Sequence, residues 1–169
     1  MNIADAVAAL VMRVPDPSGG LPDDVFYYIS RTTPLVNVDL LIKDETGRAL
    51  LSWRDDPYAG CGWHVPGGIV RFRETLEARV QKTAETELGV SDISFDPAPI
   101  ALNQIIHPHR EIRGHFVSLL YKCHVPGAWV PRNDGLLAGD VGYAMWHDRC
   151  PDNLLKVQEI YRTHIDGDA

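Results

Sequence analysis

Residues 67–90 read GGIVRFRETLEARVQKTAETELGV, and this stretch carries the strongest structural signal in the chain. From Thr75 to Leu88 it contains neither glycine nor proline and is rich in helix-forming residues. Gly89 follows at the position where helices commonly stop. The stretch therefore predicts a loop with two glycines that leads into a helix over 75–88.

One carboxylate falls on the apolar side of this predicted helix. At about 100° per residue, a single stripe contains Leu76, Val80, Thr83, Ala84 and Leu88. Glu87 lies in the middle of that stripe, and a carboxylate aimed at the interior is costly unless a cation or hydrogen-bond donors meet it. We therefore expect Glu87 to serve a metal or phosphate site, with a structural ion pair as the alternative.

The chain before this stretch predicts two strands. Apolar residues recur at every second position over 35–43, and Asp39 falls on the more polar face. A turn-forming tetrapeptide and a second apolar run over 49–54 predict that the two strands form a hairpin. In such a hairpin Asp39 and Arg54 would project from neighbouring strands.

Later segments complete the fold prediction. Further strands fit residues 100–107, 115–123 and 143–147, and a closing helix fits 153–163. The order of these elements predicts an α/β (α+β) fold with a mixed β-sheet flanked by helices, because strands precede one central helix and more strands and a last helix follow it.

Length, composition and charge indicate the organisation and exclude some partners. The 169 residues, 45% of them hydrophobic, predict one domain over 21–169 after an N-terminal helical extension and linker over 1–20. The apolar run at 6–12 is far shorter than the roughly 20 residues that span a bilayer, so we expect a cytoplasmic protein without membrane association. The net charge of -7 argues against a nucleic-acid partner but leaves small anionic ligands open.

A basic cluster interrupts this acidic chain between residues 107 and 115. It consists of His107, His109, Arg110, Arg113 and His115. We predict that Arg110 and Arg113 contact the anionic part of a nucleotide or sugar phosphate. An ordinary solvated hairpin is the main alternative, and metal binding by His107 and His109 is a weaker one.

The spacing within and around the central helix resembles the Nudix box. The matching positions are Gly68, Glu74, Ala84, Glu87, Gly89 and Val90, and Lys82 replaces an arginine conservatively. Thr83 and Thr86 stand where the family has two glutamates. The carboxylate cluster that binds several metal ions in that family is therefore reduced to one helix carboxylate.

With this change the chain resembles the GDP-mannose mannosyl hydrolase branch of the Nudix family from about Asp23 to Ile165. The segments that carry the resemblance include 31–39, 50–54 and 63–68. The resemblance implies a Nudix fold, one Mg²⁺ or Mn²⁺ ion, and hydrolysis at the sugar C1 that releases GDP and a hexose. It also implies a homodimer whose N-terminal segments pack across the subunits.

Individual roles follow from the same resemblance. It implies that the Gly67 carbonyl and the Glu87 carboxylate hold the metal, that Arg54 binds the leaving diphosphate, and that Asp39 lies near the sugar. Mg²⁺ prefers oxygen ligands and needs few from the protein when the substrate supplies phosphate oxygens. A surface arginine at 54 and a simple polar position at 39 are the alternatives.

The chain departs from this branch late in the sequence. Gly139 and Asp140 stand where the branch has a glutamine metal ligand and a histidine base. Phe116 replaces a tyrosine that donates to the leaving group, and Ile69 replaces an arginine. We take Asp140 as a replacement base or metal ligand, because a carboxylate can do either.

Three functions stay open on these residues. The leading hypothesis is Mg²⁺-dependent hydrolysis of a nucleoside-diphosphate sugar at C1. The second is conventional Nudix hydrolysis at phosphorus, which the missing carboxylates at 83 and 86 argue against. The third is an inactive module that binds a nucleotide or a nucleotide sugar.

Overall fold

Two β-sheets form the frame of the computed structural model, which describes residues 2–167. The larger sheet consists of β4 (Gly67–Ile69), β1 (Leu35–Ile42), β7 (His115–His124), β5 (Ser94–Phe95) and β6 (Ala101–Ile106). β1 and β7 run parallel while the other pairs are antiparallel, so the sheet is mixed. The smaller, antiparallel sheet has the order β3 (Gly60–His64), β2 (Ala49–Asp56), β8 (Ala144–His147).

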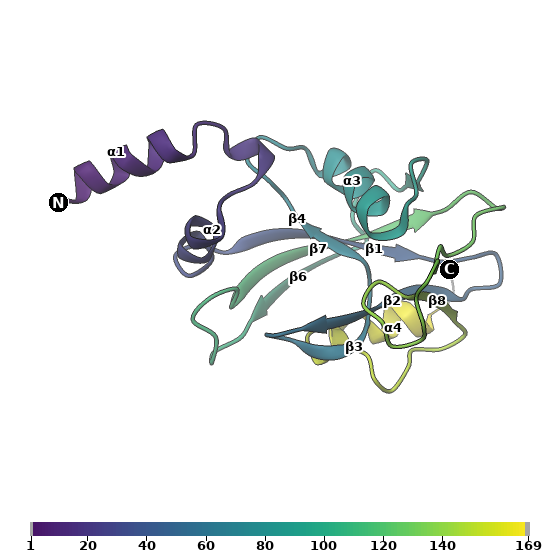
Figure 1. Ribbon diagram of the computed structural model, residues 1–169. Helices are drawn as coiled ribbons and strands as arrows, with labels where there is room; N and C mark the ends of the chain where they lie inside the picture. Colours follow the sequence, from purple (N-terminus) through teal and green to yellow (C-terminus); the bar gives the residue numbers. More distant parts are fainter. Residues whose placement is uncertain (1, 168–169) are drawn as a thin grey trace.

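The predicted central helix is present as α3 (Leu76–Leu88). The Thr75 side chain caps it by accepting a hydrogen bond from the Ala78 N–H, and Gly89 ends it with a left-handed φ of 66°. α3 packs on β1 and β4, whereas the 3-10 helix η2 (Lys156–Tyr161) and α4 (Arg162–Asp166) lie beside the smaller sheet (Figure 1). The mixed sheet between helices confirms the predicted fold class.

Alternation along β1 divides the core into two parts. Val38, Leu40 and Ile42 face α3 and join one apolar cluster, while Leu41 points the other way into a second cluster that contains Tyr161. This is the period of two that the sequence predicts for a strand. Because both faces of β1 are covered, its polar side chains lie within the protein rather than on its surface.

The predicted hairpin between 35–43 and 49–54 forms only at its turn, where the Gly47 N–H donates to the Asp44 carbonyl. The two strands belong to different sheets, and only one bridge, between Lys43 and Ala49, joins them. β1 takes β4 and β7 as its partners and β2 takes β3 and β8, so pairing with distant segments prevails over the local turn signal.

The single closing helix predicted over 153–163 is wrong. Residues 153–155 run beside β3: the Trp63 N–H donates to the Asn153 carbonyl and the Leu155 N–H donates to the Trp63 carbonyl. Because these residues are extended, helical structure begins only at residue 156, as η2 followed by α4.

The N-terminal segment forms α1 (Ile3–Arg13), which projects from the body of the molecule (Figure 1). Asn2 and Asp5 form a capping box, and no residue of α1 is buried. A short turn, η1 (Pro17–Gly19), and α2 (Asp23–Ser30) connect α1 to β1, and α2 was not predicted. Within residues 2–167, no helix is both long and apolar enough to cross a membrane.

Candidate functional site

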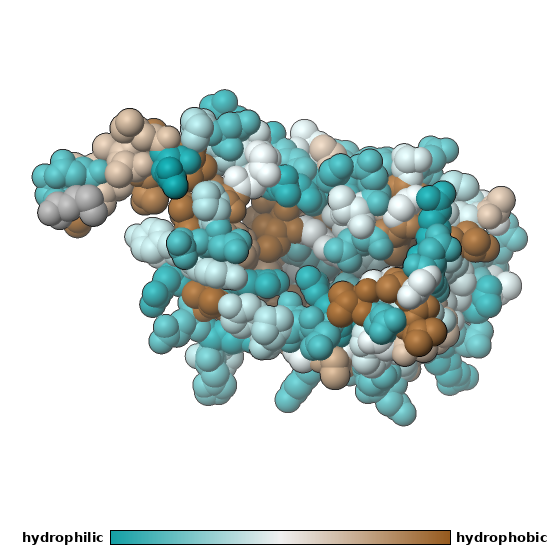
Figure 2. Space-filling model, in the orientation of Figure 1, coloured by the Kyte–Doolittle hydropathy of each residue, from teal (hydrophilic) through white to brown (hydrophobic). Residues whose placement is uncertain are grey.

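A cavity of about 820 Å³ lies between the two sheets. Its walls come from α2, β1, β2, β3, β4, η2 and the β6–β7 loop, and Figure 2 shows a recess with apolar walls near the base of α1. Five of the predicted site residues line it: Gly67, Asp39, Arg54, Arg110 and Arg113. The structure therefore brings together residues that the sequence spreads over more than seventy positions.

Asp39 is the buried carboxylate of this cavity, with 3% of its surface exposed. Its Oδ1 accepts a hydrogen bond from Asn37 Nδ2 at 2.7 Å, and its Oδ2 accepts from the Tyr161 hydroxyl at 2.6 Å and from the Ser118 hydroxyl. Burial raises the pKa of Asp39, and the hydrogen bonds from Ser118, Tyr161 and Asn37 oppose that shift. The network holds the carboxyl group in one orientation.

Close packing explains both glycines at 67 and 68. A Cβ at Gly67 would overlap Asp39 Oδ1, and a Cβ at Gly68 would overlap the Thr83 hydroxyl on α3. The pair therefore lets β4 lie directly on the buried carboxylate and on the helix. Any larger residue at either position would push β4 away from the cavity wall.

The backbone of Gly67 lies at the edge of the larger sheet. β4 is the last strand of its sheet. The Leu40 N–H donates to the Pro66 carbonyl and the Val70 N–H donates to the Val36 carbonyl, so alternate residues of this segment pair with β1. Gly67 falls between them, and its carbonyl points away from β1. A carbonyl in this orientation is directed toward a group outside the sheet.

Two arginines at the cavity share one carboxylate. Arg54 Nε lies 3.7 Å and Arg113 Nη1 lies 3.8 Å from Asp56 Oδ2. Burial opposes ionisation of Asp56, but the N–H groups of Tyr58 and Ala59 and the two guanidinium groups outweigh it and lower the pKa of Asp56. Asp56 is therefore ionised and holds both arginines in place.

Arg110 adds a third positive charge to the same wall. Its guanidinium donates to the Tyr58 carbonyl, and no carboxylate within residues 2–167 forms an ion pair with it. The Arg113 guanidinium lies 5.5 Å above the Tyr58 ring, which fixes the β6–β7 loop against the turn after β2. Three arginines facing one ionised Asp56 leave this wall with an excess of positive charge.

Glu87 does not lie in the interior as the helical wheel predicted. Its side chain is 34% exposed, whereas Val80, Thr83, Ala84 and Leu88 are buried. α3 is rotated so that Glu87 lies at the margin of the buried face and outside the wall of the large cavity. His64 Nε2 lies 3.7 Å from Glu87 Oε2.

The two threonines of the box are used in packing. The Thr86 hydroxyl donates to the Lys82 carbonyl at 2.8 Å, within α3, and the buried Thr83 side chain contacts the Gly68 backbone. Glu74 forms two hydrogen bonds with Arg79, of 2.7 and 2.8 Å, and is therefore a structural residue. Glu74 and Glu87 are the two glutamates that match the box, and of these Glu87 has no hydrogen bond to an arginine among the described residues.

A divalent ion fits this set of donors, although the protein supplies few of them. Within the described part of the chain no group of three His, Cys, Asp or Glu side chains could hold a metal. The Gly67 carbonyl and the Glu87 carboxylate are oxygen donors of the kind that Mg²⁺ prefers, and Mg²⁺ commonly takes its other ligands from water and substrate phosphates. The Gly67 carbonyl and Glu87, which were predicted from the sequence as metal ligands, are consistent with this preference of Mg²⁺.

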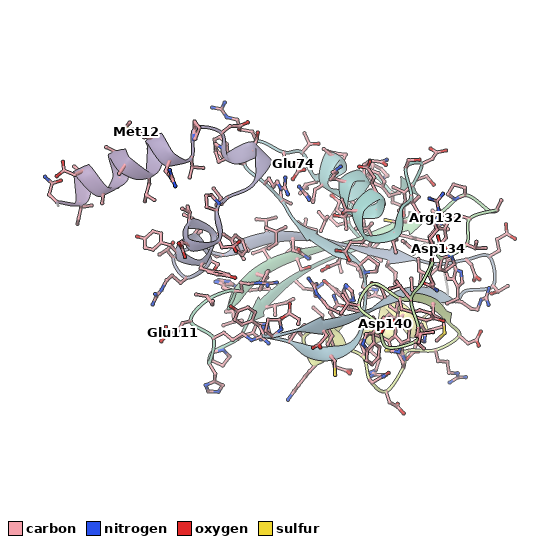
Figure 3. The ribbon with its side chains drawn as sticks, viewed as in Figure 1. Met12, Glu74, Glu111, Arg132, Asp134 and Asp140 are labelled. Atoms are coloured by element: carbon pink, nitrogen blue, oxygen red, sulfur yellow. The ribbon has the colours of Figure 1, made fainter. Side chains whose placement is uncertain are left out.

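Asp140 is not brought to the cavity. Its carboxylate accepts a hydrogen bond from the Leu137 N–H at 2.7 Å, and its own N–H donates to the Leu137 carbonyl, so it closes an exposed turn. Figure 3 shows Asp140 in front of β2 and β8, far from Glu111 in the β6–β7 loop that carries Arg110 and Arg113. The expected catalytic role of Asp140 has no support from this geometry.

Four residues of the site were not predicted from the sequence: His64, Ser118, Asp56 and Tyr161. His64 belongs to the segment 63–68 that carries the family resemblance, so its position was visible although its side chain was given no role. Asp56 lies two residues beyond the predicted end of its strand. Tyr161 falls in the segment 153–163 that was predicted as the closing helix, and no local pattern connects it with Asp39.

Comparisons with known proteins match this chain to relatives over part of its length. Agl8, a low-salt glycan biosynthesis protein of Haloferax volcanii, is 43% identical over 80 residues, 47% of this chain and 50% of that protein. An ADP-ribose pyrophosphatase of Methanocaldococcus jannaschii is 29% identical over 101 residues, 60% of this chain and 57% of that protein. The chain thus matches little more than half the length of these relatives.

Solved structures give the same result for the fold. The crystal structure of a MutT NUDIX hydrolase from Burkholderia pseudomallei superposes with a TM-score of 0.58 at 26% identity, covering 76% of this chain and 95% of that one. The model of the NUDIX domain family matches residues 33–148, which is more than half of the sequence. The chain therefore belongs to the NUDIX domain family.

Proposed function

We propose that this protein is a metal-dependent hydrolase of a nucleoside-diphosphate sugar related to GDP-mannose. Water attacks the sugar C1, the bond from C1 to the diphosphate oxygen breaks, and the nucleoside diphosphate leaves with the hexose as the second product. The observation that carries the proposal is the convergence of Arg54, Arg110 and Arg113 on one cavity that also contains Asp39 and the edge of Gly67.

The arginines supply the charge that a diphosphate needs. One ionised carboxylate, Asp56, lies between Arg54 and Arg113, and Arg110 has no carboxylate partner among the described residues. Guanidinium groups bind phosphate oxygens through paired N–H donors. Negative charge grows on the diphosphate as the C1 bond breaks, so the same contacts strengthen in the transition state and lower the barrier.

Asp39 and the metal pair complete the proposed site. The network around Asp39 holds its carboxyl rigidly against Gly67, which suits a residue that orients the hexose rather than one that exchanges protons. A divalent ion bound by the Gly67 carbonyl and Glu87 would neutralise charge on the diphosphate. Asp140 is left out, because its carboxylate is used in its own turn.

Two observations favour attack at carbon over conventional attack at phosphorus. Thr83 and Thr86 are engaged in packing, so α3 does not present the several carboxylates of an ordinary Nudix metal cluster. The relative named for glycan biosynthesis is consistent with a sugar nucleotide. The relative named as an ADP-ribose pyrophosphatase supports the alternative, in which water attacks phosphorus.

A binding module without turnover is the other alternative. It is favoured by the position of Asp140, since the structure brings no replacement for the missing histidine base to the cavity. Such a module would bind the sugar nucleotide through the arginines and release it unchanged. Saturable binding by calorimetry without any product would support it.

Product analysis tests the proposal. The protein is incubated with Mg²⁺ or Mn²⁺ and a panel of sugar nucleotides that includes GDP-mannose and GDP-glucose. We expect a nucleoside diphosphate and free hexose, with turnover lower by about 10²–10³ in Arg54→Gln if the guanidinium stabilises the leaving group. Arg48→Gln is the matched control, because Arg48 pairs with Asp44 outside the cavity. A nucleoside monophosphate and hexose phosphate would contradict the proposal.

The exposed helix α1 supports a homodimer. Its apolar side chains are open to solvent, with Ile3 85% and Met12 83% exposed. We expect two copies to cover these faces by packing α1 across the subunits. Light scattering tests this on the intact chain and on a version without residues 2–13, which spares Pro17 and Gly20 in the cavity wall. A dimer that survives the deletion would remove α1 from the interface.

A further inference from the structure

His64 is a buried histidine whose ring is oriented by the backbone. Its side chain is 4% exposed, and it lines the wall of the large cavity. Nδ1 lies 2.8 Å from the Ser52 carbonyl, directly across the β2–β3 pair. A carbonyl oxygen can only accept, so Nδ1 carries the proton in this contact, and in the neutral form of the ring Nε2 has a lone pair.

That lone pair has no partner within the described residues. His64 Nε2 is buried without a hydrogen bond, although a buried polar atom normally has one. Glu87 Oε2 lies 3.7 Å away, which is too long for a hydrogen bond. Two donors that share a metal at about 2.1 Å each can lie up to about 4.2 Å apart. The observed separation therefore fits a shared ion better than a direct contact.

We propose that His64 Nε2 and the Glu87 carboxylate bind one divalent metal ion together, so that the metal site of this chain contains a nitrogen ligand. This inference rests on the metal site of the proposed function and adds a ligand to it. The Nδ1–H bond to the Ser52 carbonyl is the outer contact that fixes the ring of a metal-binding histidine. His64 belongs to β3 and Glu87 to α3, so these two elements would hold the ion between them.

The nitrogen ligand has a consequence for metal preference. Carboxylate and carbonyl oxygens favour Mg²⁺, whereas an imidazole favours transition-metal ions. A site built from Glu87, the Gly67 carbonyl and His64 should therefore bind Co²⁺ more tightly than Mg²⁺. Replacing the ring should reduce this preference while the oxygen ligands remain.

Binding of Mn²⁺ alone to the purified full-length protein tests the inference without any substrate. Electron paramagnetic resonance follows the loss of the free-ion signal, and pulsed measurements detect coupling of bound Mn²⁺ to a ¹⁴N nucleus. His64→Asn keeps a donor where Nδ1 lies but removes Nε2. We expect its dissociation constant for Mn²⁺ to rise at least about tenfold and the nitrogen coupling to disappear.

His147→Asn is the matched control. His147 also has a buried Nε2 without a hydrogen-bond partner in the described chain, and its ring lies 4.5 Å from Trp63, the neighbour of His64. We expect wild-type Mn²⁺ binding in this variant. Nitrogen coupling measured on the wild-type protein keeps the test valid even if His64→Asn folds poorly.

The outcomes separate this inference from the proposed function. Bound Mn²⁺ without nitrogen coupling, or equal binding by wild type and His64→Asn, would overturn the role of His64. If Glu87→Gln still loses Mn²⁺ in that case, the oxygen site of the proposed function stands. Undiminished binding by Glu87→Gln would overturn both.

Discussion

Replacing Gly67 by alanine tests whether β4 lies directly on the buried carboxylate of Asp39. The new Cβ would overlap Asp39 Oδ1 and would lie 3.1 Å from the Val38 carbonyl oxygen and 3.2 Å from Asn37 Nδ2. Atoms on three sides leave the methyl group no direction in which to move. Either β4 shifts outward or the Asp39 carboxyl turns and loses the hydrogen bond from Asn37.

The expected cost follows from these two responses. Overpacking costs about 1–3 kcal/mol, and a lost hydrogen bond to a charged group costs about 1.5–3 kcal/mol. We expect Gly67→Ala to lower the free energy of unfolding by about 2–5 kcal/mol. Chemical denaturation measures this value directly, and activity should fall with it because β4 forms the cavity wall.

Two comparisons isolate the cause. Gly127→Ala adds the same methyl group where no atom lies within 4 Å, so its effect should stay below about 0.5 kcal/mol. In an Asp39→Ala background, where Oδ1 is absent, Gly67→Ala should cost less than about 1 kcal/mol. An equal cost in both backgrounds would refute the collision with Asp39.

The remaining predictions concern charge and hydrogen bonding. The pKa of Asp56 is lowered, so its contribution to stability is present above its ordinary pKa and is lost as the pH falls through the lowered value. Asp56→Asn should therefore lower the free energy of unfolding by about 1–2 kcal/mol at pH 7 and leave it unchanged in strong acid. Denaturation at both pH values measures this difference. Glu74→Ala leaves the buried Arg79 guanidinium without its partner and should cost about 3–5 kcal/mol, whereas Glu85→Ala in an exposed pair should change the denaturation midpoint little. Tyr161→Phe removes a donor to Asp39 and should cost about 1–3 kcal/mol in the same assay; no loss would show that Asp39 does not need this bond.

Local sequence patterns were sufficient to predict α1, α3 and the strands β1, β2, β6, β7 and β8, but not α2, β3, β4 or β5. The helix at 75–88 and the strand at 35–43 are confirmed because capping, glycine position and alternation are properties of a few neighbouring residues. Pairing between distant strands was not predictable in this way. The expected hairpin does not extend beyond its turn because β1 and β2 each find better partners elsewhere, which no local turn signal reveals.

The site was predicted in part, and the misses have physical causes. Asp39 and Arg54 do share a cavity, although they reach it from different sheets rather than from one hairpin. The wheel placed Glu87 inside because it assumes that the apolar stripe defines the buried face, whereas α3 leaves Glu87 at the margin. Alignment placed Asp140 in the site, but the turn that its own carboxylate closes keeps it outside.

Hydrolysis of a sugar nucleotide in ¹⁸O-water tests the central claim most directly. The protein is supplied with a divalent metal ion and GDP-mannose, and both products are analysed by mass spectrometry, with Glu87→Gln as the control. We expect ¹⁸O in the hexose, unlabelled nucleoside diphosphate, and loss of turnover in the control. Label in a phosphate product would contradict attack at C1, and the absence of any metal-dependent turnover would contradict the assignment as a hydrolase of this substrate.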